Sequence, residues 1–159
     1  MKLVPGVLAV LVVLVSCDRS PFQEERRSTE VIRKARVYLI ADPSEEGCGG
    51  AAAPYEVELG SPSPALGGTV EALLSLGDRS DGSGFYNALA HSPLKIERME
   101  RSGPVVRFYL TGYLELGGEC DAPRVLSQLT ETATQFSDVD TAEFFLDGKP
   151  LAELLSGKG

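Results

Sequence analysis

The most reactive side chains in this 159-residue sequence are three cysteines, Cys17, Cys48 and Cys120. Cys17 ends an N-terminal segment in which Lys2 precedes an almost purely apolar run from Leu3 to Val15. One positive charge followed by about a dozen apolar residues is the layout of a signal peptide. A membrane-spanning helix needs roughly 20 apolar residues, so this run is short for a permanent span. The segment therefore predicts export of the chain.

The residues just before Cys17 make this prediction more specific. Leu14-Val15-Ser16-Cys17 resembles the lipobox of bacterial lipoproteins, in which a small residue precedes the cysteine that is acylated and becomes the N-terminus. The resemblance implies a signal peptide of residues 1–16 and fatty acids such as palmitate on Cys17. It also implies an extracytoplasmic protein that is lipid-anchored to a bacterial membrane. The alternatives are an uncleaved anchor and an ordinary signal peptide with a chance cysteine.

The other two cysteines form an even pair in an exported chain, where disulfides persist. Both Cys48 and Cys120 lie among glycines, which predicts loops that can bring distant segments together. A bridge between them would close a loop of about 72 residues, for which the chain-entropy model gives about 4–4.5 kcal/mol of stabilisation. Free thiols and a two-cysteine metal site are the alternatives. A zinc site normally needs four Cys or His ligands, and His91 is the only histidine, so we expect no metal.

Other candidates for chemistry are weak. His91 lies in a loop without an evident nucleophile, and Gly82-Ser83-Gly84 lacks the spacing of a nucleophile elbow. The acidic stretch from Asp78 lacks the closing glutamate of an EF-hand calcium loop. Glu56 and Glu58 would share the solvated face of one strand. The sequence therefore predicts no catalytic residues, no enzyme activity and no cofactor.

The charge balance restricts the partners. Cleavage after residue 16 removes Lys2 as the only charged side chain, which leaves 14 basic and 23 acidic side chains and a net charge of about −9. An acidic surface disfavours binding to nucleic acid and to anionic lipid headgroups. The lipid on Cys17 is then the expected link to the membrane, because several acyl chains anchor a protein well.

The rest of the sequence is divided into a tether and one domain. Residues 17–35 are charged and lack a hydrophobic face, so we expect a tether after the lipidated cysteine. The domain is predicted over 36–155, a length that can bury a core. Its predicted strands are at 37–40, 55–59, 94–99, 105–110 and 139–146, the third and fourth of them forming a hairpin.

Two amphipathic helices are predicted between these strands. The first begins with Thr69 as N-cap. The second has Asp121 as N-cap and carries an apolar stripe from Val125 to Phe136. Phe85, Tyr86 and Leu89 are interpreted as an apolar patch around one helical turn. The order β-β-α-β-β-α-β indicates an α+β fold, with one mixed sheet and two main helices packed on it.

The C-terminal half resembles a known family. Gln128-Leu129 and Thr132 in the second helix, Phe136 at its end, Val139 before the last strand and the closing Asp147-Gly148 are similar to the end of the GerMN domain of sporulation and germination lipoproteins. Val37-Tyr38-Leu39 and 71–74 fit the same pattern. The resemblance implies a non-enzymatic interaction domain.

The leading hypothesis is therefore an envelope lipoprotein that acts by binding an envelope protein or by self-association. The alternative is a binding module for cell-wall glycan or a small ligand. It would use the polar loop 77–84 with the aromatic residues Phe85, Tyr86 and Tyr113 as the ligand or partner surface. The absence of tryptophan weakens the glycan hypothesis.

We expect non-reducing mass spectrometry of the exported protein to find a peptide in which Cys48 and Cys120 are joined. Cysteines in an oxidising compartment pair when the fold brings them together. Free thiols at both positions would contradict the predicted bridge.

Overall fold

The computed structural model describes residues 31–43, 48, 50–78 and 82–157. The predicted signal peptide, Cys17 and residues 18–30 of the tether lie outside the described residues. The elements are, in chain order, β1 (Val31–Ala41), β2 (Ala51–Pro64), α1 (Ala65–Ser75), β3 (Phe85–Tyr86), β4 (Lys95–Ser102), β5 (Val105–Thr111), α2 (Asp121–Thr134), β6 (Thr141–Leu146), β7 (Lys149–Pro150) and α3 (Leu151–Ser156).

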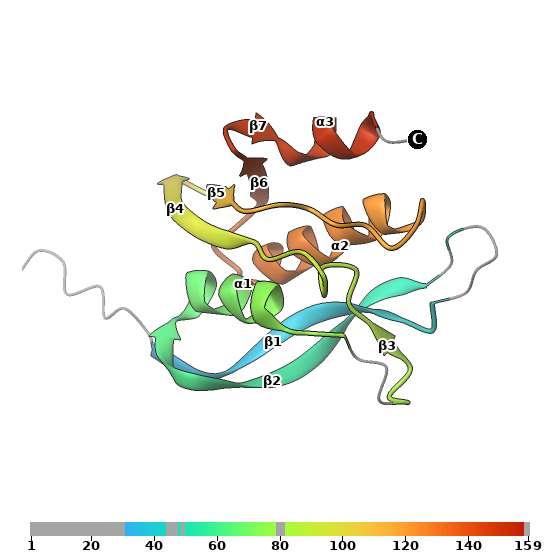
Figure 1. The fold of residues 1–159 in the computed structure, drawn as a ribbon. Coiled ribbons are helices and arrows are strands. Elements are labelled where there is room, and N and C mark those ends of the chain that lie inside the picture. The colour runs from blue at the N-terminus through green and yellow to red at the C-terminus, as the bar shows by residue number, and fades with distance from the viewer. Residues whose placement is uncertain (1–30, 44–47, 49, 79–81, 158–159) are drawn as a thin grey trace, which may run out of the picture.

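The strands form two sheets with the main helices between them. One sheet has the order β2-β1-β3 and the other β4-β5-β6-β7. Figure 1 shows β1 and β2 along one side, α1 and α2 across the middle, and the second sheet beyond them. The α+β class and the two main helices are confirmed. The single mixed sheet of the prediction is divided into two, of which the second is mixed.

The β1–β2 hairpin is longer than its sequence pattern indicates. β1 pairs with β2 as far as Val31 and Pro64, so the strand includes 31–35 of the predicted tether and β2 includes the predicted loop 60–64. Proline is tolerated on the edge strand β2, because it removes a donor that the sheet does not use. The inner face carries the buried Val37 and Leu39. On the outer face, Lys34 pairs with Glu56 at 2.8 Å.

α1 begins four residues before the predicted N-cap. Thr69 lies inside the helix and its hydroxyl donates to the carbonyl of Ala65 at 2.5 Å, so the N-cap prediction was wrong. The helix starts through Gly67 and Gly68 because packing overrides their low propensity. Val70, Leu73 and Leu74 are buried toward the core.

The second sheet confirms the predicted hairpin, since β4 and β5 pair antiparallel. β6 lies parallel to β5, and α2 makes the crossover between them. The rings of Phe108 and Phe144, on neighbouring strands, stack with centroids 5.0 Å apart in the core. α3 was not predicted; it follows β7 and buries Leu151 and Leu155.

Side chains of α2 satisfy the open edge of β1. Among the described residues, β1 pairs with β3 only at Ile40 and Ala41. Further back along β1, the N–H of Tyr38 donates to Thr132 Oγ1 at 3.0 Å, and Gln128 Nε2 donates to the Tyr38 carbonyl at 3.0 Å. Gln135 Nε2 donates to the Arg36 carbonyl at 2.7 Å. The polar side of α2 thus replaces a neighbouring strand.

Gln128 makes the most hydrogen bonds of these side chains. It is fully buried, and its Oε1 also accepts from the N–H of Ala88 at 2.9 Å. Its Nε2 makes a further contact of 3.2 Å with Asn87 Oδ1. Gln128 therefore joins β1, α2 and the segment after β3 at one point.

None of the described helices is both long enough and apolar enough to cross a lipid bilayer.

We expect Gln128→Met to lower the free energy of unfolding by about 1–3 kcal/mol, because the Ala88 N–H and Tyr38 carbonyl lose a buried partner while the side-chain volume is nearly kept. Urea unfolding measures this loss. The matched control is Gln135→Met, whose partly exposed site should cost less than about 1 kcal/mol. Equal effects of the two substitutions would contradict the assigned role.

Candidate functional site

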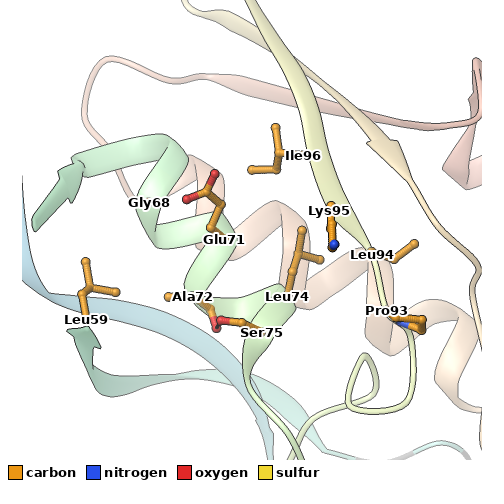
Figure 2. Close-up of a pocket in the computed structure, with 10 residues that line it drawn as sticks. All are labelled: Leu59, Gly68, Glu71, Ala72, Leu74, Ser75, Pro93, Leu94, Lys95 and Ile96. Carbon is orange, nitrogen blue, oxygen red and sulfur yellow. Dashed lines mark hydrogen bonds between the residues drawn. The ribbon is translucent and has the colours of Figure 1, made fainter. Parts of the chain in front are cut away.

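An open groove lies between α1 and the start of β4. Its volume is about 760 Å³. Figure 2 shows α1 along one side and the chain from Pro93 to Ile96 along the other, with Leu59 of β2 at one end. The lining residues are Leu59, Gly68, Glu71, Ala72, Leu74, Ser75, Pro93, Leu94, Lys95 and Ile96.

Small residues on α1 account for the hollow. Gly68, Ala72 and Ser75 are spaced by four and three residues, so they lie on one face of the helix. Their side chains rise little above the helix backbone, and the apolar Leu94 and Ile96 stand opposite them. The opposite face of α1 faces the core. On the groove side of α1, Gly68 and Leu74 are buried, whereas Ala72 is half-buried and Ser75 is exposed, so this side of the helix is only partly covered in the described part of the chain.

The β4 side of the groove is firmly held. Gly112 has φ of 119°, and a Cβ on it would lie 2.2 Å from the carbonyl oxygen of Pro93. Only glycine permits this close approach. Ser92, buried to 2% exposure, donates to the Glu115 carbonyl at 3.0 Å and accepts from the Glu115 N–H at 2.9 Å. The groove is therefore preformed on this side.

The apolar surface continues along β4. Ile96 lies opposite Leu110 and Met99 opposite Phe108, and both partners face the core, so Ile96 and Met99 share a face. Met99 is nevertheless 43% exposed. The ionisable groups that line the groove are Glu71 and Lys95, one on each side. This combination suits a partner with an apolar ridge and polar flanks.

A second, smaller hollow lies at the N-terminus of α2. Its volume is about 370 Å³, and Tyr86, Asp121 and Arg124 are among its lining residues. Asp121 Oδ2 accepts from the Tyr86 hydroxyl at 2.8 Å and from the Gly117 N–H at 2.7 Å. Asp121 was predicted as the N-cap, but Cys120 occupies that position and no side-chain cap bond is present. The Asp121 carboxylate instead joins the start of α2 to Tyr86 of β3 and to Gly117 in the preceding segment.

Tyr86 has a strongly perturbed phenol. Burial and the hydrogen bond to Asp121 raise the pKa of Tyr86 to about 12. The Arg124 guanidinium lies 5.6 Å from the centre of the same ring. This arrangement keeps the phenol protonated. The Tyr86–Asp121 hydrogen bond therefore has a structural role, which is to hold β3 against the start of α2.

Phe85 and Tyr86, two of the three aromatic residues that were predicted as a ligand surface, face different neighbours. Phe85 packs edge-on against Tyr55 with ring centroids 5.1 Å apart, whereas the neighbouring Tyr86 faces Asp121. They belong to β3, not to a helical turn. Tyr113 lies after β5 and is 59% exposed. Phe85 and Tyr86 thus face different neighbours and do not make one aromatic platform.

The predicted disulfide is present. Cys48 and Cys120 are joined with an S–S distance of 2.08 Å, and the bond links the segment between β1 and β2 to the start of α2. Cys17 lies outside the described residues, as do 79–81 of the polar loop. His91 is exposed and does not line the groove. Within the described ranges, no group of three or more His, Cys, Asp or Glu side chains is placed to hold a metal.

The groove was not among the sites predicted from the sequence. The stripe of Gly68, Ala72 and Ser75 is visible in the sequence, and it is the signal that could have indicated a second packing face. The residues opposite that stripe, Leu94 and Ile96, are brought there by the tertiary packing of β4 and cannot be read from the sequence.

The fold is that of an α+β domain, and the sequence matches a known family. A family model described as Germane, sporulation and spore germination, matches residues 17–152. The match covers most of the chain, so the chain belongs to this family, and the resemblance to GerMN domains is confirmed. The family is not a known enzyme family.

Solved structures agree with this assignment at the level of fold. The first GerMN domain of the sporulation protein GerM from Bacillus subtilis is 18% identical, with a TM-score of 0.54 over 74% of this chain and 84% of that one. The tandem GerMN domains of GerM give the same identity and TM-score over 76% of this chain and 41% of that one. No curated protein sequence matches the chain.

We expect Tyr86 to titrate near pH 12, about two units above an ordinary tyrosine. The folded state holds this proton more tightly than the unfolded state, so the stabilisation it gives is complete below pH 10 and is lost as the pH rises toward 12. The ultraviolet absorbance of tyrosinate in wild type minus Tyr86→Phe measures the titration. A difference curve centred near pH 10 would contradict the buried hydrogen bond.

Proposed function

We propose that this chain is a non-enzymatic envelope lipoprotein whose GerMN domain binds a protein partner, or a second copy of itself, through the groove between α1 and β4. Lipid on Cys17 would hold it at a membrane on the extracytoplasmic side, and the charged residues after Cys17 would separate the domain from the lipid surface. The open groove is the observation that carries the proposal.

The chemistry of the groove supports a protein partner. Its β4 side is largely aliphatic, its α1 side is built largely from small residues, and its ionisable groups, Glu71 and Lys95, stand one on each side. Protein interfaces have this arrangement of an apolar centre and a polar rim. The exposed thioether of Met99 adds an adaptable contact on the same strand face, and methionine is common at binding surfaces.

The glycan alternative has less support. Sugar binding relies on aromatic side chains that stack on the ring, and the groove has no aromatic side chain among its lining residues. Phe85 and Tyr86 are engaged with Tyr55 and Asp121. Of the three aromatic residues predicted for a ligand surface, only Tyr113 would remain for such contacts.

A photo-crosslinking amino acid at Ser75, tested in native membranes, should capture a specific protein or a second copy of the chain. Ser75 is exposed and lines the groove. The same crosslinker at Thr130, exposed on α2, is the matched control. Adding Ala72→Arg should reduce the Ser75 adduct by about tenfold or more, equivalent to about 1.4 kcal/mol of binding free energy, because the long cation fills the groove.

Two outcomes would overturn the proposal. One is the same set of adducts from Ser75 and from Thr130. The other is retention of the domain by purified peptidoglycan together with no specific protein adduct, which would favour the glycan alternative.

A further inference from the structure

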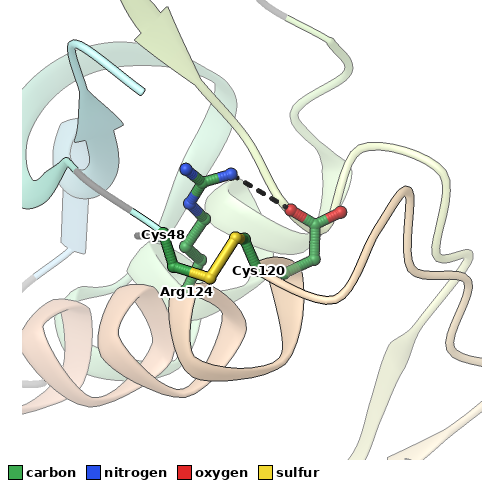
Figure 3. The surroundings of a disulfide bond; sticks show 4 residues. Cys48, Cys120 and Arg124 are labelled. Atoms are coloured by element: carbon green, nitrogen blue, oxygen red, sulfur yellow. Dashed lines mark ion pairs between the residues drawn. A yellow bond between two sulfur atoms is a disulfide. The ribbon is translucent and has the colours of Figure 1, made fainter. Parts of the chain in front are cut away.

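The Cys48–Cys120 disulfide lies at the periphery of the domain. Cys48 is exposed and Cys120 is half-buried. The backbone of Cys48 has φ of 54°, in the left-handed region that residues with a Cβ seldom adopt. Figure 3 shows the side chain of Arg124 extending past the bond from the first turn of α2. Of the two cysteines, Cys48 is therefore the one more open to attack from solvent.

The surroundings of Cys120 favour a thiolate. Cys120 is the N-cap residue of α2, a helix of 14 residues, and the partial positive charge of a helix N-terminus stabilises a sulfur anion. Arg124 carries a full positive charge and lines the same small hollow as Cys120. Asp121 offsets part of it, because its Oδ1 lies 3.7 Å from Arg124 Nη1. The other carboxylate oxygen of Asp121, Oδ2, accepts hydrogen bonds from the Gly117 N–H and the Tyr86 hydroxyl.

Other contacts hold α2 in place without the bond. Gln128, Thr132 and Gln135 connect α2 to β1 two or more turns away from Cys120. The Asp121–Tyr86 hydrogen bond fastens the start of α2 to β3. Cleavage of the bond would therefore free Cys48 from α2 while these contacts keep α2 packed on β1 and β3.

We propose that Cys48–Cys120 is a thiol-exchange site for an exported dithiol reductant. The attacking thiolate forms a bond with Cys48 Sγ, the Cys48–Cys120 bond breaks, and Cys120 leaves as a thiolate. The second thiol of the reductant, as its thiolate, then displaces Cys48, so the reductant is oxidised to its disulfide and both cysteines are reduced. Two electrons and two protons pass to the protein. This modification is independent of the proposed partner groove.

The first test is the rate of reduction by dithiothreitol in the full-length folded protein, quenched with N-ethylmaleimide and followed by mass. We expect the folded protein to be reduced within about a hundredfold of the rate in guanidinium chloride, and to keep its near-ultraviolet circular dichroism afterwards. Protection by more than about a hundredfold, or loss of the folded signal on reduction, would overturn the proposal.

The second test locates the attack. Reduced glutathione should form a mixed disulfide on Cys48, with N-ethylmaleimide on Cys120, as peptide mass spectrometry can distinguish. Glutathione on Cys120 instead, or no mixed disulfide, would overturn the assignment.

Two arginine variants test the role of Arg124. Arg124→Gln should slow exchange by about three- to tenfold, because the leaving thiolate loses its cation. Arg107→Gln, which removes an exposed pair with Glu143 on β6, should leave the rate unchanged. Equal rates for wild type and Arg124→Gln would overturn the role given to Arg124.

Discussion

The contact on which the rest of this domain depends is the one between the polar side of α2 and the open edge of β1. A strand edge within a domain presents backbone donors and acceptors, and leaving them unsatisfied on burial costs about 1–3 kcal/mol each. β3 satisfies only the end of that edge among the described residues, at Ile40 and Ala41. The side chains of Thr132 and Gln128 bond the backbone N–H and carbonyl of Tyr38. The side chain of Gln135 donates to the backbone carbonyl of Arg36.

This contact sets the positions of both sheets. α2 is the crossover between the parallel strands β5 and β6, so its attachment to β1 fixes the second sheet against the first. α1 packs beside α2 on the same hairpin and turns its small residues toward β4. The groove is thus a consequence of where α2 lies, although α2 contributes no residue to its lining. A buried polar joint of this kind favours one register of helix on strand.

Much of this arrangement could be predicted from local patterns. The β4–β5 hairpin follows from alternating apolar residues around the turn at 102–104, and α2 follows from its apolar stripe. The disulfide follows from cysteine number and export. Within α2, Gln128 and Thr132 belong to the pattern that indicated the family, and their role in satisfying β1 gives that pattern a physical reason.

The remaining features depend on contacts that a linear pattern does not contain. Residues 60–64 have the composition of a loop, yet pairing with the start of β1 extends the strand through Pro64. Gly67 and Gly68 disfavour a helix, and packing of the buried Val70 and Leu73 supplies the free energy to begin it earlier. Asp121 has the type of an N-cap residue, but the nearby Gly117 and Tyr86 offer it two donors instead.

The groove and the disulfide are physically separable. Their hollows share no lining residue, and the joint at Gln128 lies in neither of them. A cut at Cys48–Cys120 frees Cys48 from α2, whereas the Asp121–Tyr86 hydrogen bond still holds the start of the helix. The bonds from Gln128, Thr132 and Gln135 still hold its later turns to β1. The wall formed by Ser92, Pro93 and Gly112 depends on β4 and β5 rather than on the disulfide. A change in thiol state therefore acts on one end of the domain while the surface proposed for a partner keeps its shape.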